Sequence, residues 1–141
     1  MSIEDRLADL GIDLPPVAKP VAAYVPAIQV GDQISTSGQL PLVSGSLPMT
    51  GLVGDQISQG DAAGQARVAA LNALAAAADV AGGVNNIRRV VRVVVYVAST
   101  ADFTAQPAVA NGASELFGEI FGDAGRHIRS AIGVASLPLG A

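Results

Sequence analysis

An alanine-rich stretch followed directly by a run of β-branched residues constrains this fold more than any other part of the sequence. Residues 61–81 are packed with alanine, and Gly82-Gly83 ends the pattern. The spacing predicts an amphipathic helix with Asp61 as its N-cap. Its inward face would carry Val68, Leu71, Leu74, Ala75 and Ala78. The next segment, 87–97, is rich in β-branched residues, which favour a largely buried strand.

The other segments predict further helices and strands. Ser2 followed by the apolar spacing of residues 3–10 predicts a short helix, and Gly31-Asp32 predicts a hairpin turn between strands at 24–30 and 33–40. Residues 41–60 have the composition of a loop with one short strand at 52–53. Pro107 opens a second amphipathic helix, and a strand at 126–136 follows it. The apolar face of this second helix would carry Val109, Ala113, Leu116, Phe117 and Ile120.

This order predicts two helices on one face of a four- or five-stranded sheet. The other face of the sheet would then be uncovered, and association with further copies would bury it. The composition supports this expectation, because 50% of the residues are hydrophobic and only 14% are charged. The length of 141 residues fits a single domain spanning residues 1–141.

Composition also excludes several classes of function. A net charge of -4 argues against nucleic acid as the main partner, and the arginines at 88, 89 and 92 lack the interleaved aromatic residues of a nucleic-acid site. The chain has no cysteine and one histidine, His127, so we expect no metal site and no cofactor. We find neither a leader-like segment nor an apolar run long enough to cross a bilayer, so we expect a cytoplasmic protein that does not bind membranes.

The segment 126–133 carries the strongest functional signal. Alternation along a strand places Ile128, Ser130 and Ile132 on one side and His127, Arg129, Ala131 and Gly133 on the other. Packing explains a guanidinium between small neighbours poorly, whereas a bidentate grip on a small carboxylate explains it well. An arginine paired with an acid at an interface is the alternative. If the Ile128 side packs on the helices, Arg129 points away from its own core into a site shared with a neighbour.

Taken together, four segments at their relative spacing resemble the reactive-intermediate imine deaminase family, also called the YjgF/YER057c/UK114 or RidA family. The segments are Tyr24, the run Ser35-Thr36-Ser37-Gly38-Gln39-Leu40-Pro41, Val95-Tyr96-Val97 with Asp102-Phe103, and Arg129-Ser130. The resemblance covers nearly the whole chain. It implies an α+β chorismate mutase-like fold, with a mixed sheet under two helices, and a homotrimer with clefts between subunits. It also implies hydrolysis of enamines or imines such as 2-aminoacrylate to 2-keto acids and ammonia.

The same resemblance implies the roles of individual residues. The family's carboxylate-binding arginine falls on Arg129, its cleft tyrosine on Tyr24 and its strand serine on Ser37. Gly38 and Gln39 would supply backbone near the ligand. Ala131 and His127 lie on the Arg129 side of the strand and would line the cleft, where His127 is a candidate for proton transfer near neutral pH.

Two departures from the family leave catalysis open. Ala131 stands where the deaminases usually have a cysteine, and the carboxylate that they carry on a further C-terminal strand would lie beyond Ala141. Hydrolysis of an imine is the preferred reading, and a non-catalytic trimer that binds a small carboxylate is the first alternative. An endoribonuclease or translation inhibitor, a description long attached to the family, is a weaker alternative.

Overall fold

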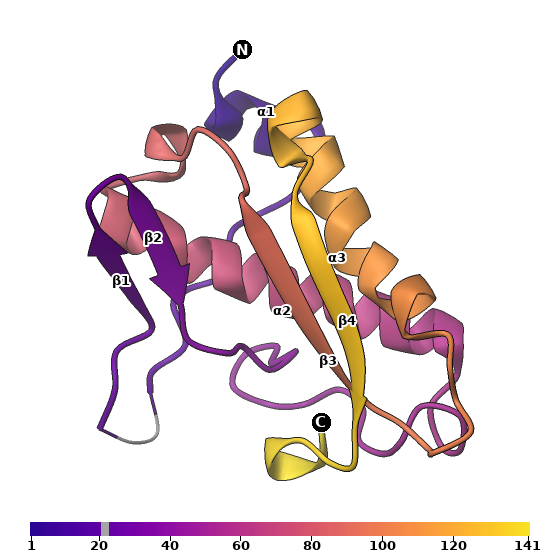
Figure 1. Ribbon diagram of the computed structural model, residues 1–141. Coiled ribbons are helices and arrows are strands. Elements are labelled where there is room, and N and C mark those ends of the chain that lie inside the picture. The colour runs from indigo at the N-terminus through magenta and orange to yellow at the C-terminus, as the bar shows by residue number, and fades with distance from the viewer. Residues whose placement is uncertain (21–22) are drawn as a thin grey trace.

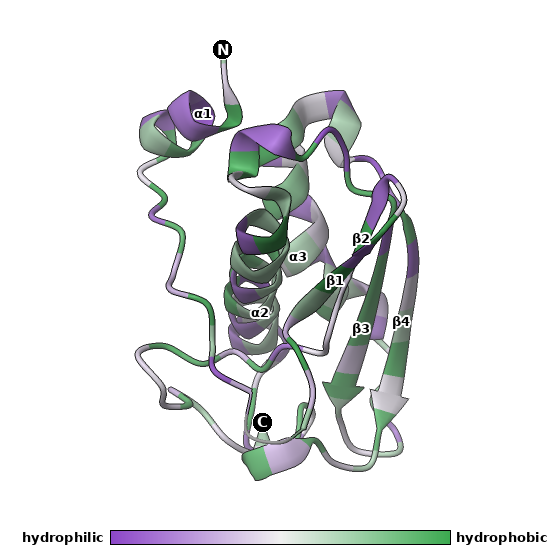
Figure 2. Ribbon diagram, turned by 90° about the vertical axis from the view of Figure 1, so that its left-hand side faces the viewer, coloured by the Kyte–Doolittle hydropathy of each residue, from purple (hydrophilic) through white to green (hydrophobic). Residues whose placement is uncertain are grey.

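The structure, a computed structural model, describes residues 1–20 and 23–141 as three helices and four strands. In chain order these are α1 (Ile3–Asp9), β1 (Ala27–Val30), β2 (Gln33–Thr36), α2 (Gln59–Ala81), β3 (Arg92–Ala98), α3 (Gln106–Phe121) and β4 (Ile128–Val134). The strands form one layer, and α2 and α3 cover one side of it (Figures 1 and 2). This α+β arrangement confirms the predicted fold class.

Helix α2 begins three residues earlier than predicted. Its N-cap is Ser58, whose hydroxyl accepts a hydrogen bond from the backbone N–H of Asp61 at 3.1 Å. Asp61 therefore lies in the first turn, where its carboxylate favours the positive end of the helix dipole, and its assignment as the cap was wrong. The predicted end is confirmed, because Gly82 adopts the left-handed conformation (φ 81°).

The core lies between α2 and α3 and extends to the inner side of the strands. Gly112 allows the two helices to touch, because a Cβ at this position would collide with the backbone carbonyl of Ala63. The predicted inward face of α3 is buried throughout, at Val109, Ala113, Leu116, Phe117 and Ile120. Leu74, Ala75 and Ala78 of α2 are buried as predicted.

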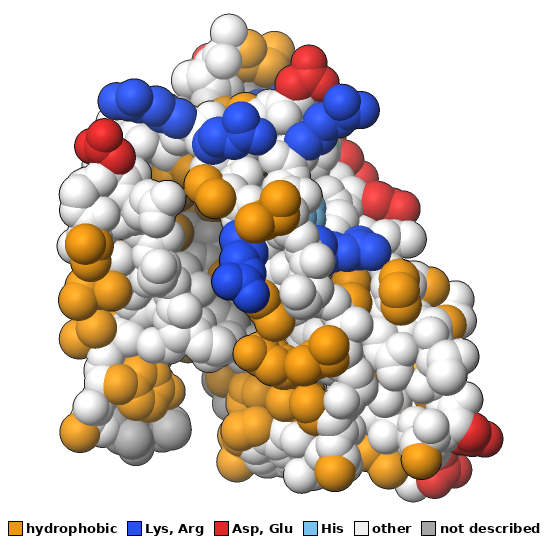
Figure 3. Space-filling model, viewed as in Figure 1, with side chains coloured by type: hydrophobic (Ala, Val, Ile, Leu, Met, Phe, Trp, Pro, Cys, Tyr) orange, Lys and Arg blue, Asp and Glu red, His pale blue; other side chains and the backbone are white. Residues whose placement is uncertain are grey.

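The strands pair in two separate sets. β1 and β2 form the predicted antiparallel hairpin around Gly31-Asp32, and β3 and β4 pair in parallel with Arg92 opposite Ile128. No hydrogen-bonded pairing joins β2 to β3 among the described residues, so the expected continuous sheet is present as two pairs in one layer. Figure 3 shows the surface hollowed between the pairs. β3 begins at Arg92 rather than residue 87, because the Val90 N–H donates to the carbonyl of Ala124 instead of to a strand.

The side of the strands that faces away from the helices is uncovered in this chain. Figure 3 shows hydrophobic side chains, in orange, on this face of the molecule. Large apolar side chains are exposed along all but one of the strands. They include Ile28 and Val30 on β1, Tyr96 on β3, and Ile128 and Ile132 on β4. The predicted open face is confirmed, and its apolar character is what a face buried between subunits would need.

Candidate functional site

Arg129 faces the helix layer, so it does not point away from its own core as it would if the Ile128 side of the strand packed on the helices. It pairs in register with Val93, which packs against the core, while Ile128 is 67% exposed on the opposite face. Arg129 Nη1 donates to Asn111 Oδ1 at 2.8 Å and to Ser114 Oγ at 3.1 Å, and both residues belong to α3. β4 lies beside α3, which offers polar partners to a strand residue on this side, and the Ile128 side of the strand faces away from the helices.

His127, just before β4, joins the same hydrogen-bond network. Its Nδ1 lies 2.7 Å from the carbonyl oxygen of Gly125, and its Nε2 lies 2.9 Å from Ser114 Oγ. A carbonyl oxygen can only accept, so Nδ1 carries the hydrogen and Nε2 of the neutral ring is an acceptor. Phe117 meets the imidazole edge to face, with ring centroids 6.0 Å apart. Three contacts therefore fix the orientation of this ring.

Gly125 explains how His127 comes so close to α3. A Cβ at Gly125 would overlap the backbone carbonyl of Phe117, so only glycine lets this turn pack directly on the helix. The turn delivers both the Gly125 carbonyl and the imidazole to one side of Ser114. Local backbone geometry thus brings residues 114 and 127 together, although the two do not form a motif in the sequence.

These residues line an open pocket of about 290 Å³. Its walls are formed by Ser114, Gly118, Gly125, Arg126, His127 and Arg129. Two lining side chains are arginines and none is a carboxylate, so the pocket presents positive charge. Among the described residues, neither arginine forms an ion pair with an acid. The alternative, an arginine paired with an acid across an interface, concerns contacts between chains and stays a prediction.

The hairpin residues predicted for the site lie elsewhere in this chain. Figure 1 places β1 and β2 on the far side of β3 from β4, the strand that carries Arg129. Tyr24 is 47% exposed, and Ser37 Oγ donates to the carbonyl of Val25 at 2.6 Å. Gln39 Nε2 lies 3.4 Å from the Ser37 carbonyl, and the space around Gly38 is open. One chain thus brings Arg129, His127 and Ala131 to one side of β4, but leaves the hairpin residues apart from them.

Sequence reasoning missed Ser114 and Asn111. Both lie on α3 and contact Arg129, and Ser114 also contacts His127. One signal was available: Asn111, Ser114 and Gly118 follow helical spacing and form a polar or small-residue stripe beside the apolar face. Without the position of β4, nothing said which residues that stripe would meet.

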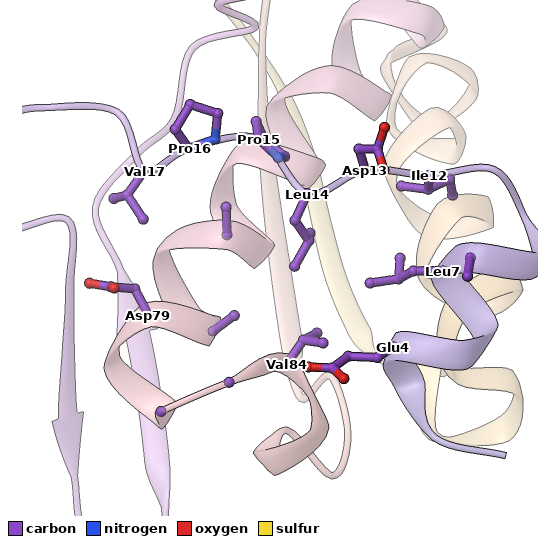
Figure 4. A pocket seen from close by; sticks show the side chains of 15 residues that line it. Glu4, Leu7, Ile12, Asp13, Leu14, Pro15, Pro16, Val17, Asp79 and Val84 are labelled. Carbon is purple, nitrogen blue, oxygen red and sulfur yellow. The ribbon is translucent and has the colours of Figure 1, made fainter.

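A larger hollow lies between the N-terminal segment and the C-terminal half of α2. It has a volume of about 650 Å³, and its walls include the apolar side chains of Leu7, Leu14 and Val84 and the carboxylates of Glu4, Asp13 and Asp79. In Figure 4 these three apolar side chains point toward its centre, the carboxylates of Asp13 and Asp79 lie at its edges, and the Glu4 carboxylate lies beside Val84. It contains no cation and no nucleophile paired with a base, so we assign it to the packing of the N-terminal segment over α2.

Other classes of site find no support in the part of the chain that the structure describes. No group of three histidine or acidic side chains there is arranged to hold a metal ion. None of the described helices has the length and apolar character needed to cross a membrane.

Comparison with known proteins supports the fold and the family. The sequence model of the family described as "YjgF/chorismate mutase-like, putative endoribonuclease" matches residues 4–141. The chain belongs to this family. It is 41% identical over 137 residues to protein TCP17 of Trypanosoma cruzi, covering 96% of this chain and 86% of that protein.

Two crystal structures place the chain more finely within the YjgF family. Protein Atu1372 of Agrobacterium tumefaciens, whose function is unknown, is 43% identical with a TM-score of 0.88, over 99% of this chain and 86% of that one. Escherichia coli TdcF with bound serine is 25% identical with a TM-score of 0.60, over 90% and 85% of the two chains. The chain therefore shares the YjgF fold and is more similar to a relative of unknown function than to TdcF.

Proposed function

We propose that this protein binds small carboxylates at Arg129 and hydrolyses 2-imino acids, or the enamines in equilibrium with them, to 2-keto acids and ammonia. The observation that carries the proposal is the uncompensated positive charge of Arg129 in an open pocket. A guanidinium with neutral partners retains its full attraction for an anion, whereas one paired with a carboxylate does not.

The donors of Arg129 are divided in a way that suits a carboxylate. A guanidinium has five N–H donors, and the two hydrogen bonds to Asn111 and Ser114 both come from Nη1. Within the described residues, Nε and Nη2 make no hydrogen bond, so the planar edge that they form remains for a ligand. Two parallel bonds to a carboxylate need such an edge, and Nη1 would hold it in place. Each charge-assisted bond contributes about 1.5–3 kcal/mol.

Hydrolysis of an imine asks little more of the protein. Water adds to the electrophilic C2 carbon, a proton reaches the nitrogen, and the C–N bond breaks to release ammonia. His127 is the group in the pocket suited to accept the proton of the attacking water and return it to the nitrogen. Ala131 would leave room for the substrate on the same side of β4.

A second copy of the chain would complete the site. The proposal includes a homotrimer in which Tyr24, Ser37, Gly38 and Gln39 of one subunit approach Arg129 of the next. The apolar face of the strands supports association, because this chain leaves it exposed. TdcF supports the ligand class, since the serine in that structure is a small amino acid with a carboxylate. The cytoplasmic location expected from the sequence belongs to the same proposal.

A coupled assay that generates 2-aminoacrylate in solution tests the proposal. We expect the protein to release ammonia and pyruvate faster than the spontaneous reaction, and Arg129→Ala to abolish this gain. Arg88→Ala, which removes an exposed arginine outside the pocket, is the matched control and should retain activity. Equal turnover by wild type and Arg129→Ala would contradict the assignment of the site.

The alternatives give different results with the same proteins. A binding trimer would retain 2-keto acids tightly but show no turnover. Cleavage of RNA that survives Arg129→Ala would favour an endoribonuclease, for which the exposed arginines at 88, 89 and 92 are the candidates. The acidic charge of the chain makes this the weaker alternative.

A further inference from the structure

We propose that Ser114 and His127 form a nucleophile and base that cleave short esters of an anionic acyl group through an acyl-serine intermediate. The proposal goes beyond imine hydrolysis, which needs no covalent nucleophile. It uses the same pocket but a different residue, Ser114, as the reacting group.

The pair has the geometry of an activated serine. Ser114 Oγ lies 2.9 Å from His127 Nε2, and His127 Nδ1 donates to the Gly125 carbonyl at 2.7 Å. This second bond fixes the tautomer in which Nε2 accepts, so Ser114 must donate its hydroxyl hydrogen to the ring. Such an arrangement, with a nucleophile, a base and a third group that orients the base, is the structural signature of covalent catalysis.

Arg129 adds a donor at the reacting atom. Its Nη1 lies 3.1 Å from Ser114 Oγ, so a positive charge lies beside the oxygen to which the acyl group would bond. A fixed positive donor at that position stabilises the tetrahedral intermediate. The serine hydroxyl thus touches both a base and a cation.

The pocket also gives a substrate access to the hydroxyl. Gly118 lies one helical turn after Ser114 and lines the pocket, and nothing lies within 4 Å of where its Cβ would be. Arg126 lines the same pocket and has no acidic partner among the described residues. We therefore expect the acyl group to be short and to carry a carboxylate that Arg126 attracts.

The atoms balance over two steps with water as the co-reactant. Ser114 Oγ bonds to the ester carbonyl carbon, its proton passes to His127 Nε2, and the alcohol leaves with that proton. Water then loses a proton to Nε2 and bonds to the acyl carbon, which releases the acid and restores the Ser114 hydroxyl. No oxidant, metal or further group takes part.

Labelling with a fluorophosphonate tests the nucleophile without any imine chemistry. We expect one label per chain by intact mass, mapped to Ser114, and none on Ser114→Ala. His127→Ala should slow labelling at least about 100-fold, and added imidazole should restore part of the rate. Ser130→Ala, which changes an exposed serine on the opposite face of β4, is the matched control and should label like wild type. Thermal melting verifies that each variant is folded. If the His127→Ala protein does not fold, His127→Gln is used in its place.

Hydrolysis of two nitrophenyl esters tests the substrate class. The mono-p-nitrophenyl ester of succinate should react at least about tenfold faster than the acetate, and Arg126→Ala should remove this preference. Absence of labelling at Ser114, or labelling unaffected by loss of His127 in a folded variant, would overturn the proposal. Because neither probe contains an imine, failure here leaves the deaminase assay to be judged on its own.

Discussion

Of the two hollows in this molecule, the larger has the fewer reactive groups and the smaller has the more. The larger, about 650 Å³, lies under the N-terminal segment and is lined by apolar side chains with acids at its edges. The smaller, about 290 Å³, contains two arginines, the single histidine and a serine that touches it. Volume would select the first as the site. Hydrogen-bond partners and charge select the second, because only there do reactive groups converge.

The two hollows also differ in what their residues do for the fold. Leu7 is 5% exposed and joins the main core cluster, so the larger hollow is a by-product of packing. Arg129 is exposed, and both of its hydrogen bonds within the described residues go to polar side chains of α3. Changes in the first hollow should therefore affect stability, and changes in the second should affect ligand binding.

The largest effect should follow from truncation in the larger hollow. Leu7→Ala removes a buried side chain and should lower the free energy of unfolding by about 2–4 kcal/mol. Urea denaturation measures this loss, and calorimetric titration at low temperature should find carboxylate binding to the folded protein unchanged. Lost binding in a folded Leu7→Ala protein would show that the two hollows are coupled.

The converse change should affect binding and not stability. Arg129→Ala should weaken binding of 2-oxobutanoate at least about 100-fold, or by at least about 2.7 kcal/mol, because two charge-assisted hydrogen bonds are lost. Its free energy of unfolding should change by less than about 1 kcal/mol, since the lost bonds lie at the surface. Arg129→Lys keeps the positive charge but not the planar pair of N–H donors, so its affinity for 2-oxobutanoate should fall between those of wild type and Arg129→Ala. A lysine variant as strong as wild type would rule out bidentate binding.

Two glycines of the smaller pocket should respond with opposite sign. Gly125→Ala should cost about 2 kcal/mol, because its methyl group meets the Phe117 carbonyl. Gly118→Ala, in open space on a helix, should gain about 0.5–1 kcal/mol. Thermal melting of both variants compares them directly. A stabilising Gly125→Ala would mean that the turn carrying His127 does not pack on α3 as described.

Much of the fold follows from patterns within single segments. The hairpin turn at Gly31-Asp32, the inward face of α3 and the end of α2 at Gly82 were all predictable, because each depends on local spacing or on one backbone conformation. The start of α2 was not, since Ser58 and Asp61 are both good caps and only the first makes the bond. Local chemistry alone therefore allows either residue as the N-cap, and the packing of the helix determines that it is Ser58.

The candidate site shows where such reasoning ends. Alternation correctly placed His127, Arg129 and Ala131 on one side of a strand, but not which side faces the helices. Both sides of β4 carry small or apolar residues, so the pattern does not decide the direction. The contacts of Arg129 with Asn111 and Ser114 arise only when α3 lies beside β4, and they join residues 15 and 18 positions apart.

A crystal structure of the protein soaked with 2-oxobutanoate tests the central claim most directly. We predict the carboxylate on the Nε and Nη2 edge of Arg129, with the bonds from Nη1 to Asn111 and Ser114 retained. A ligand seated in the larger hollow, or on the arginines at 88 and 92 with the Arg129 edge still empty, would contradict the account.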